Sequence, residues 1–257
     1  NNKINNVNNK KQIGQIRVIP EKVEWKNLLF LNEKISTISK LRSPYIKGFI
    51  IIQLIVISAG IINIISKKIF YTGIFYCIFE YLLIGLLLTP LNYIFISLIY
   101  FDNSWKYFVL LSILTLLEIF LLKLRNWDRL KIVVYIPLIT LVVIILDLIF
   151  NLNMMSDSLL GYSSVIGARY YGIGNEYMGF LVGAVLTFST GIIEINDNFN
   201  KKNIDYLILL FFLIITLIIG IGNFGANFGG TITMLAASIL TFLYLNKYKL
   251  KLKSYIY

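Results

Sequence analysis

The most constraining feature of the sequence is a series of long apolar blocks separated by short polar segments. A helix that crosses the hydrocarbon layer of a bilayer, about 30 Å thick, needs about 20 mainly apolar residues. Several blocks reach or approach that length. The blocks are Gly48–Ser66, Ile69–Phe101, Tyr107–Leu122, Ile132–Phe150, Tyr177–Ile193, Ile204–Ile221 and Thr231–Leu245. This pattern predicts an all-α fold: a polytopic transmembrane helical bundle of about seven spans, with glycine-rich outer loops.

Composition and charge support a membrane protein and argue against a nucleic-acid partner. Hydrophobic residues make up 58% of the chain and charged residues only 14%, whereas a soluble domain carries about a quarter. The net charge is +11, but many of the basic residues lie at the ends of apolar blocks, where Lys and Arg anchor helices to lipid headgroups. We therefore expect membrane lipids as partners and no nucleic acid.

Two residue counts exclude common kinds of chemistry. The sequence contains no histidine, which removes the commonest neutral-pH general base and the commonest metal ligand. Its single cysteine, Cys77, lies inside an apolar block, so an intrachain disulfide is impossible. No cluster of metal ligands with a recognisable spacing is present. The sequence therefore predicts neither a metal site nor a cofactor.

Three regions are expected along the chain. Residues 1–44 are polar and rich in Asn and Lys, which predicts a linker or surface arm. Within this region, 25–41 is compatible with an amphipathic helix lying on a membrane surface, and equally with a flexible tether. Residues 45–246 form the predicted transmembrane domain, and 247–257 a basic cytoplasmic tail.

The distribution of Lys and Arg predicts the orientation of the bundle. Basic residues are concentrated between the third and fourth blocks, between the fifth and sixth, and after the seventh, whereas the alternate junctions carry almost none. Because basic loops stay in the cytoplasm, this pattern places the C-terminus inside and residues 151–176 and 222–230 outside.

The number of spans depends on Pro90. If Ile69–Phe101 crosses once, the chain has seven spans and the N-terminal arm lies outside. If Pro90 marks a hairpin, there are eight spans and the arm, with its many lysines, lies inside. Charge favours eight, but Leu91–Phe101 is too short to cross a bilayer. We predict seven.

The two outer loops carry the strongest candidate for a binding site. The string Gly-Ile-Gly-Asn occurs in both, at 172–175 and 220–223. Each loop precedes a helix whose N-terminus points outward, and helix N-termini attract anions. Arg169 is a fork-shaped donor for phosphate or carboxylate. The predicted substrate-binding residues are Arg169, Tyr170, Tyr171, Gly172, Gly174, Asn175, Asn223 and Asn227.

A structural interpretation of the same residues stays open. Gly179 and Gly183 form a G-x-x-x-G pair that serves close helix packing in many membrane proteins. Asn175 can act as an N-cap, with Glu176 stabilised by the helix dipole. Residues 220–225 match the dinucleotide fingerprint G-x-G-x-x-G, but an apolar span precedes them where that fingerprint requires a strand. We therefore reject a dinucleotide site.

Three carboxylates, those of Glu80, Glu118 and Asp147, lie inside apolar blocks, where ionisable groups usually face a partner or a cavity. Asp147 is close to the outer end of its block. Because histidine is absent, Glu176 and Asp147 are the predicted general acid or base.

The strings GYSSVIGARYYGIGNEYMG and GANFGGT resemble the C-terminal membrane domain of a poorly characterised group of bacterial envelope proteins. The resemblance covers roughly residues 159–236 and is strongest over Arg169–Glu176. In that group the membrane domain can follow an extracytoplasmic domain that resembles alkaline phosphatases. The resemblance implies a bacterial cytoplasmic membrane and an external N-terminal arm. It implies no phosphatase activity here, because this sequence has neither that domain nor its metal ligands.

Three hypotheses follow. The first is a protein that binds an anionic envelope substrate, such as a phosphate-bearing lipid or a lipid-linked glycan, at its outer face. The second is a transporter or flippase, in which Glu80 and Glu118 would line a path. The third is a membrane anchor for a missing extracytoplasmic domain. Sequence alone leaves open whether the protein is an enzyme.

Overall fold

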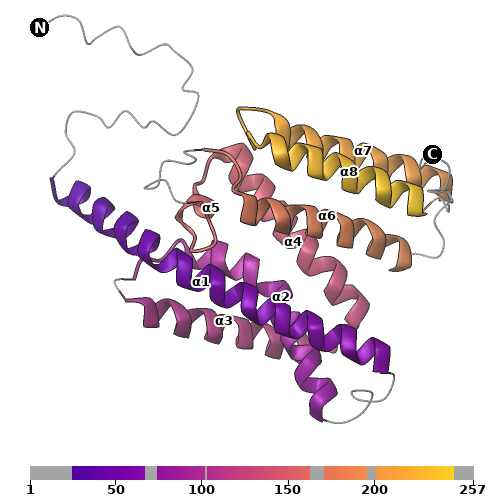
Figure 1. The fold of residues 1–257 in the computed structure, drawn as a ribbon, viewed down its shortest axis with the longest axis horizontal. Coiled ribbons are helices and arrows are strands. Elements are labelled where there is room, and N and C mark those ends of the chain that lie inside the picture. Colours follow the sequence, from indigo (N-terminus) through magenta and orange to yellow (C-terminus); the bar gives the residue numbers. More distant parts are fainter. Residues whose placement is uncertain (1–24, 67–73, 102, 163–170, 196–200, 246–257) are drawn as a thin grey trace, which may run out of the picture.

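The computed structural model describes residues 25–66, 74–101, 103–162, 171–195 and 201–245, and within these ranges it contains eight α-helices (Figure 1). Seven of them are long, and α5 is a single turn. The helices are α1 (Trp25–Ser66), α2 (Ile74–Ile96), α3 (Ser104–Leu124), α4 (Arg129–Phe150), α5 (Met154–Asp157), α6 (Asn175–Ile195), α7 (Lys201–Gly220) and α8 (Phe228–Leu245).

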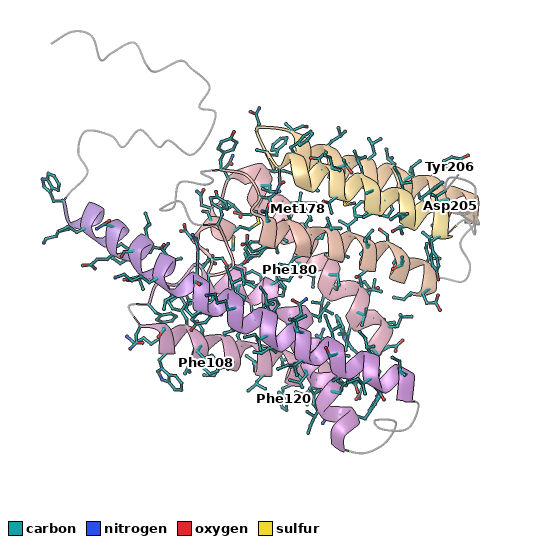
Figure 2. The ribbon with its side chains drawn as sticks, viewed as in Figure 1. Phe108, Phe120, Met178, Phe180, Asp205 and Tyr206 are labelled. Carbon is teal, nitrogen blue, oxygen red and sulfur yellow. The ribbon has the colours of Figure 1, made fainter. Side chains whose placement is uncertain are left out.

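The helices confirm the predicted multi-span bundle. Among the described residues, six helices are long and apolar enough to cross a membrane, and the apolar part of α7, Ile204–Gly220, is a shorter seventh candidate. Their outward faces carry large apolar side chains, including Phe108 and Phe120 on α3 and Leu213 on α7 (Figure 2). Such faces suit contact with lipid tails. The chain is a multi-pass membrane protein.

The hairpin considered at Pro90 is wrong, because α2 continues through this residue and ends at Ile96. Proline lacks a backbone N–H and cannot complete the helical hydrogen-bond pattern. The hydroxyl of Thr89, the residue before it, donates to the carbonyl oxygen of Gly85 at 2.6 Å. With α2 unbroken at Pro90, the described residues hold six long apolar helices and the shorter apolar part of α7 as candidate spans.

Helix α1 begins inside the segment predicted as a polar arm and passes through the predicted domain boundary at residue 45. It has 42 residues, which corresponds to about 63 Å at a rise of 1.5 Å per residue. That is about twice the thickness of the hydrocarbon layer. In place of a separate surface helix over 25–41, the structure therefore has one long helix whose N-terminal half extends beyond the span.

The helices form two groups with α4 between them. Helices α1, α2 and α3 lie on one side and α6, α7 and α8 on the other, and α4 crosses from one group to the other (Figure 1). Helix α4 packs against both α2 and α6. The approach to α6 is close at Gly191, where an added Cβ would lie 2.3 Å from Cγ2 of Val134. The core between the groups includes the fully buried Ile144, Leu181 and Val185.

One end of the bundle gathers the polar connections that matter for function. There α2, α4 and α7 end and α3, α6 and α8 begin (Figure 1). We call this the loop end, defined by residues 97–103, 151–162, 171–174 and 221–227, with 102 outside the described residues. The seven-span topology brings these segments together although they are far apart in the sequence.

Candidate functional site

The loop that follows α4 is built around Asp147. Helix α4 is capped by Asn151 in the left-handed conformation (φ 50°), and Asn153 is also left-handed (φ 64°). This path returns the chain over the helix end, so that the Asp147 carboxylate accepts hydrogen bonds from the backbone N–H groups of Met154 (3.0 Å) and Met155 (2.8 Å). Asp147 is 4% exposed. These bonds fix the start of α5, and the predicted role of Asp147 in proton transfer stays a prediction.

Arg42 is the central cation of the loop end, and sequence reasoning missed it. Its side chain is buried, and it donates from Nε to the carbonyl oxygen of Ser158 at 3.3 Å and from Nη2 to that of Ser156. The carboxylates of Asp157 and Glu176 lie close enough to interact electrostatically with the guanidinium. Arg42 thus links α1 to the loop after α4 and to the start of α6.

Two further contacts attach the N-terminal half of α1 to the loop end. The ammonium group of Lys34 lies 2.7 Å from Oδ2 of Asp157, and the hydroxyl of Tyr45 donates to the carbonyl oxygen of Ser104 at 2.6 Å. Together with Arg42 these residues fix the register of α1. Lys34, the buried Ile38 and Arg42 follow one another at intervals of four residues and so lie on one face of the helix. This spacing is the sequence signal that could have identified these contacts.

The first turn of α6 is anchored below the same loop. The hydroxyls of Tyr177 and Ser158 lie 2.6 Å apart, and Ser158 Oγ also accepts the N–H of Leu160 at 3.2 Å. Tyr177 is 1% exposed. The neighbouring Glu176, predicted as a general acid or base, is only partly buried. Its carboxylate therefore sits at the boundary between the buried network and the surface.

The two glycine-rich loops are joined to each other. The backbone N–H of Ile173 donates to the carbonyl oxygen of Gly225 at 2.8 Å. In return, Nδ2 of Asn227 donates to the carbonyl oxygen of Ile173 at 3.1 Å, and Oδ1 of Asn227 accepts the N–H of Gly230 at 2.8 Å. Asn227, predicted to bind substrate, is 4% exposed. It is used to hold the two loops and the start of α8 together.

This close approach explains two of the glycines. Gly172 has φ +78°, and an added Cβ would lie 2.2 Å from the carbonyl oxygen of Gly225. At Gly225 itself a Cβ would meet backbone atoms of Ile219, the nearest at 2.5 Å. Both positions therefore require glycine for loop contact. Gly174, also predicted to bind substrate, is buried against Tyr162.

The remaining predicted residues divide into surface groups and groups outside the described residues. Tyr171, Asn175 and Asn223 are exposed at the loop end. Arg169 and Tyr170 lie outside the described residues.

A small cavity of about 20 Å³ lies beside the Asp147 loop, which is enough for a water molecule. Its lining residues are Asp147, Leu148, Asn151, Asn153, Met155, Ser156, Tyr162, Gly172 and Phe224.

Glu80 and Glu118 lie away from this site. Glu80 accepts a hydrogen bond from Nε of Arg129 at 2.6 Å. Glu118 accepts one from Nδ2 of Asn92 at 2.8 Å. Asn92 is twelve positions after Glu80 on α2, or about 18 Å along the helix axis. Each carboxylate thus has its own local partner.

The glycine pair on α6 does not serve packing within the described part of the chain. Both Gly179 and Gly183 are exposed, and an added Cβ at either position would have nothing within 4 Å. The close approach of α6 to α4 occurs at Gly191 instead.

Comparison with known proteins gives no relative, since no protein family, curated protein or solved structure matches the chain.

Proposed function

We propose that this multi-pass membrane protein belongs to a bacterial cytoplasmic membrane and binds an anionic envelope substrate on the outward-facing surface of its loop end. The substrate class that fits best is a phosphate-bearing lipid or a lipid-linked glycan. The observation that carries the proposal is the junction at Ile173 and Gly225, because it brings the N-termini of α6 and α8 together at one end of the bundle.

The electrostatics of the loop end support an anion. Helix N-termini carry partial positive charge, and those of α6 and α8 are joined here through Ile173 and Gly225. The buried guanidinium of Arg42 lies near Glu176 in the first turn of α6. Two of the neighbouring carboxylates are engaged with donors of the protein itself: Asp157 with Lys34, and Asp147 with two backbone N–H groups. Their charges are thus partly compensated before any ligand binds.

In this proposal Arg169 supplies the direct contact to the anion. It lies outside the described residues, but it is two residues before Tyr171, so their Cα atoms are at most about 7.6 Å apart. The segment that contains it starts after Tyr162 and ends before Tyr171, and both Tyr162 and Gly172 line the small cavity. A guanidinium there can form paired hydrogen bonds with a phosphate.

In this proposal the ligand is held by its headgroup at the surface of the loop end. A lipid-linked substrate needs no enclosed pocket, since the surrounding bilayer holds its apolar part. Tyr171, Asn175 and Asn223 are exposed where such a headgroup would lie. Glu176 is the side chain placed to exchange a proton if the substrate is also transformed.

Native mass spectrometry of the detergent-purified protein tests this proposal. Wild type is compared with Arg169→Ala and with Lys40→Ala, a matched control at an exposed position of α1. We expect wild type and the control to retain a phospholipid or a lipid-linked glycan that Arg169→Ala loses. Equal retention of lipid by all three proteins would show that Arg169 does not contribute to binding.

The thermal midpoint of the same samples separates binding from folding. An unchanged midpoint in Arg169→Ala, together with the loss of lipid, supports an anion-binding role. A lower midpoint with the same lipid content would instead favour a purely structural role for the loop, as expected of a membrane anchor.

A further inference from the structure

The turn between α3 and α4, at the end of the bundle opposite the loop end, concentrates positive charge. We call residues 123–131 the basic turn. Its four cationic residues are all exposed, and the carboxylates beside them are Glu80, in contact with Arg129, and Asp128. The four are Lys123, Arg125, Arg129 and Lys131. The turn therefore carries a net positive charge after its own acidic neighbours are counted.

Two of these cations are held in place by aromatic residues of α2. The guanidinium of Arg129 lies over the ring of Tyr76, 5.1 Å from its centroid, while its Nε donates to Glu80 at 2.6 Å. The ammonium group of Lys123 lies over the ring of Tyr81 at 5.6 Å. Cation–π contacts of this kind restrict otherwise mobile side chains. Positioned cations bind an anion at a lower entropic cost than freely rotating ones.

The basic turn also sits where a lipid headgroup would lie. Trp127 packs edge-on against Tyr135 with ring centroids 6.1 Å apart, and tryptophan is enriched at the membrane–water boundary. Below it, the last turns of α3 expose the apolar side chains of Phe120 and Leu124, and Figure 2 shows Phe120 pointing away from the bundle. A molecule bound at this surface would contact the cations of the basic turn at one end and the exposed apolar face of α3 along the rest of its length.

We propose that the basic turn binds the headgroup of an anionic phospholipid, whose acyl chains lie along the exposed face of α3. Charge complementarity selects an anion, and the adjoining apolar face selects a lipid over a soluble anion. Basic pockets on the cytoplasmic side of membrane helices bind anionic headgroups in this way. This site is separate from the one proposed at the loop end, and neither depends on the other.

Quenching of Trp127 fluorescence by brominated lipids tests the proposal. The chain has three tryptophans, so the double variant Trp25→Phe/Trp105→Phe leaves Trp127 as the only reporter. The protein is reconstituted in vesicles that contain brominated phosphatidylglycerol or brominated phosphatidylcholine at equal mole fraction. We expect stronger quenching by the anionic lipid.

Neutralisation of exposed cations then locates the site. In the Trp127 reporter, Arg125→Gln and Lys131→Gln should each weaken the preference for phosphatidylglycerol by roughly fivefold. The matched controls Lys40→Gln and Lys47→Gln, on α1, should leave it unchanged. Equal quenching of Trp127 by the two lipids, or a preference that survives both neutralisations, would overturn the proposal. These variants leave Arg169 and the two glycine-rich loops intact, so failure here is distinguishable from failure of the proposed function.

Discussion

The side-chain amide of Asn227 donates a hydrogen bond to the carbonyl oxygen of Ile173 at 3.1 Å, and it joins two loops that are 54 residues apart in the sequence. The same side chain also accepts the N–H of Gly230. One buried residue therefore satisfies backbone groups of the α6 loop and of the first turn of α8. Asn227, which the sequence pattern predicts to bind a ligand, thus contributes to the stability of the loop end.

Replacement of Asn227 by alanine should destabilise the protein. It removes hydrogen bonds to Ile173 and Gly230 and leaves buried backbone groups without these partners, for a loss of about 2 kcal/mol. Thermal unfolding in detergent should show a clear decrease of the midpoint. Asn223→Ala is the matched control, because Asn223 is exposed in the same loop. An equal midpoint for the two variants would contradict the structural role of Asn227.

Gly172→Ala should be more damaging than Gly222→Ala. At Gly172 the new Cβ would lie 2.2 Å from a backbone oxygen and the residue has positive φ, whereas Gly222 has nothing within 4 Å of an added Cβ. Because the loops must separate to relieve this clash, we expect a loss of at least about 2 kcal/mol. Hydrogen exchange at Ile173, whose N–H is bonded to Gly225, should increase in Gly172→Ala alone. Unchanged protection of this amide would show that the loops do not touch as described.

Glycines along α6 should respond to alanine in opposite ways. Gly183→Ala has open space for its Cβ and removes a residue of low helix propensity, so stability should be unchanged or increase by up to about 1 kcal/mol. Gly191→Ala would place a Cβ 2.3 Å from Val134 and should force α4 and α6 apart. The thermal midpoint of Gly191→Ala should lie below the wild-type value, and that of Gly183→Ala should lie at or above it. If Gly183→Ala is the less stable of the two, a helix must cover the glycine pair in the membrane.

Arg42→Ala should loosen the attachment of α1. The change removes the hydrogen bonds to the carbonyl oxygens of Ser156 and Ser158, and hydrogen bonds from a charged group contribute about 1.5–3 kcal/mol each. Faster hydrogen exchange is expected in residues 154–162 and in the N-terminal half of α1. Lys40→Ala, an exposed change on the same helix, controls for loss of charge. The same exchange pattern in both variants would show that Arg42 does not hold the loop.

The helices could be predicted because the length of an apolar block can be read directly from consecutive residues of the sequence. Each long helix from α2 to α8 begins and ends within a few residues of an apolar block; the C-terminus of α4 at Phe150 coincides with its predicted limit. The largest difference is α1, which starts at Trp25. Its N-terminal half is too polar to resemble a span, and it is held in place by contacts to distant residues such as Asp157 and Ser104.

The candidate site was only partly predictable for the same reason. The alternation of spans was enough to place the loops around Gly172 and Gly225 at one end of the bundle. It could not distinguish an asparagine that binds a ligand from one that bonds to a neighbouring loop, since both functions use the same side chain. In the structure both the Asn227 amide and the Asp147 carboxylate bond to backbone groups of loops. Arg42 was missed because its partners are backbone carbonyls, which leave no signature in the sequence.

The junction between Ile173 and Gly225 has a mechanical consequence. Helices α6 and α8 are joined where they begin, at the bond between Ile173 and Gly225. A rearrangement that keeps this junction would displace the starts of α6 and α8 least and their C-terminal ends most.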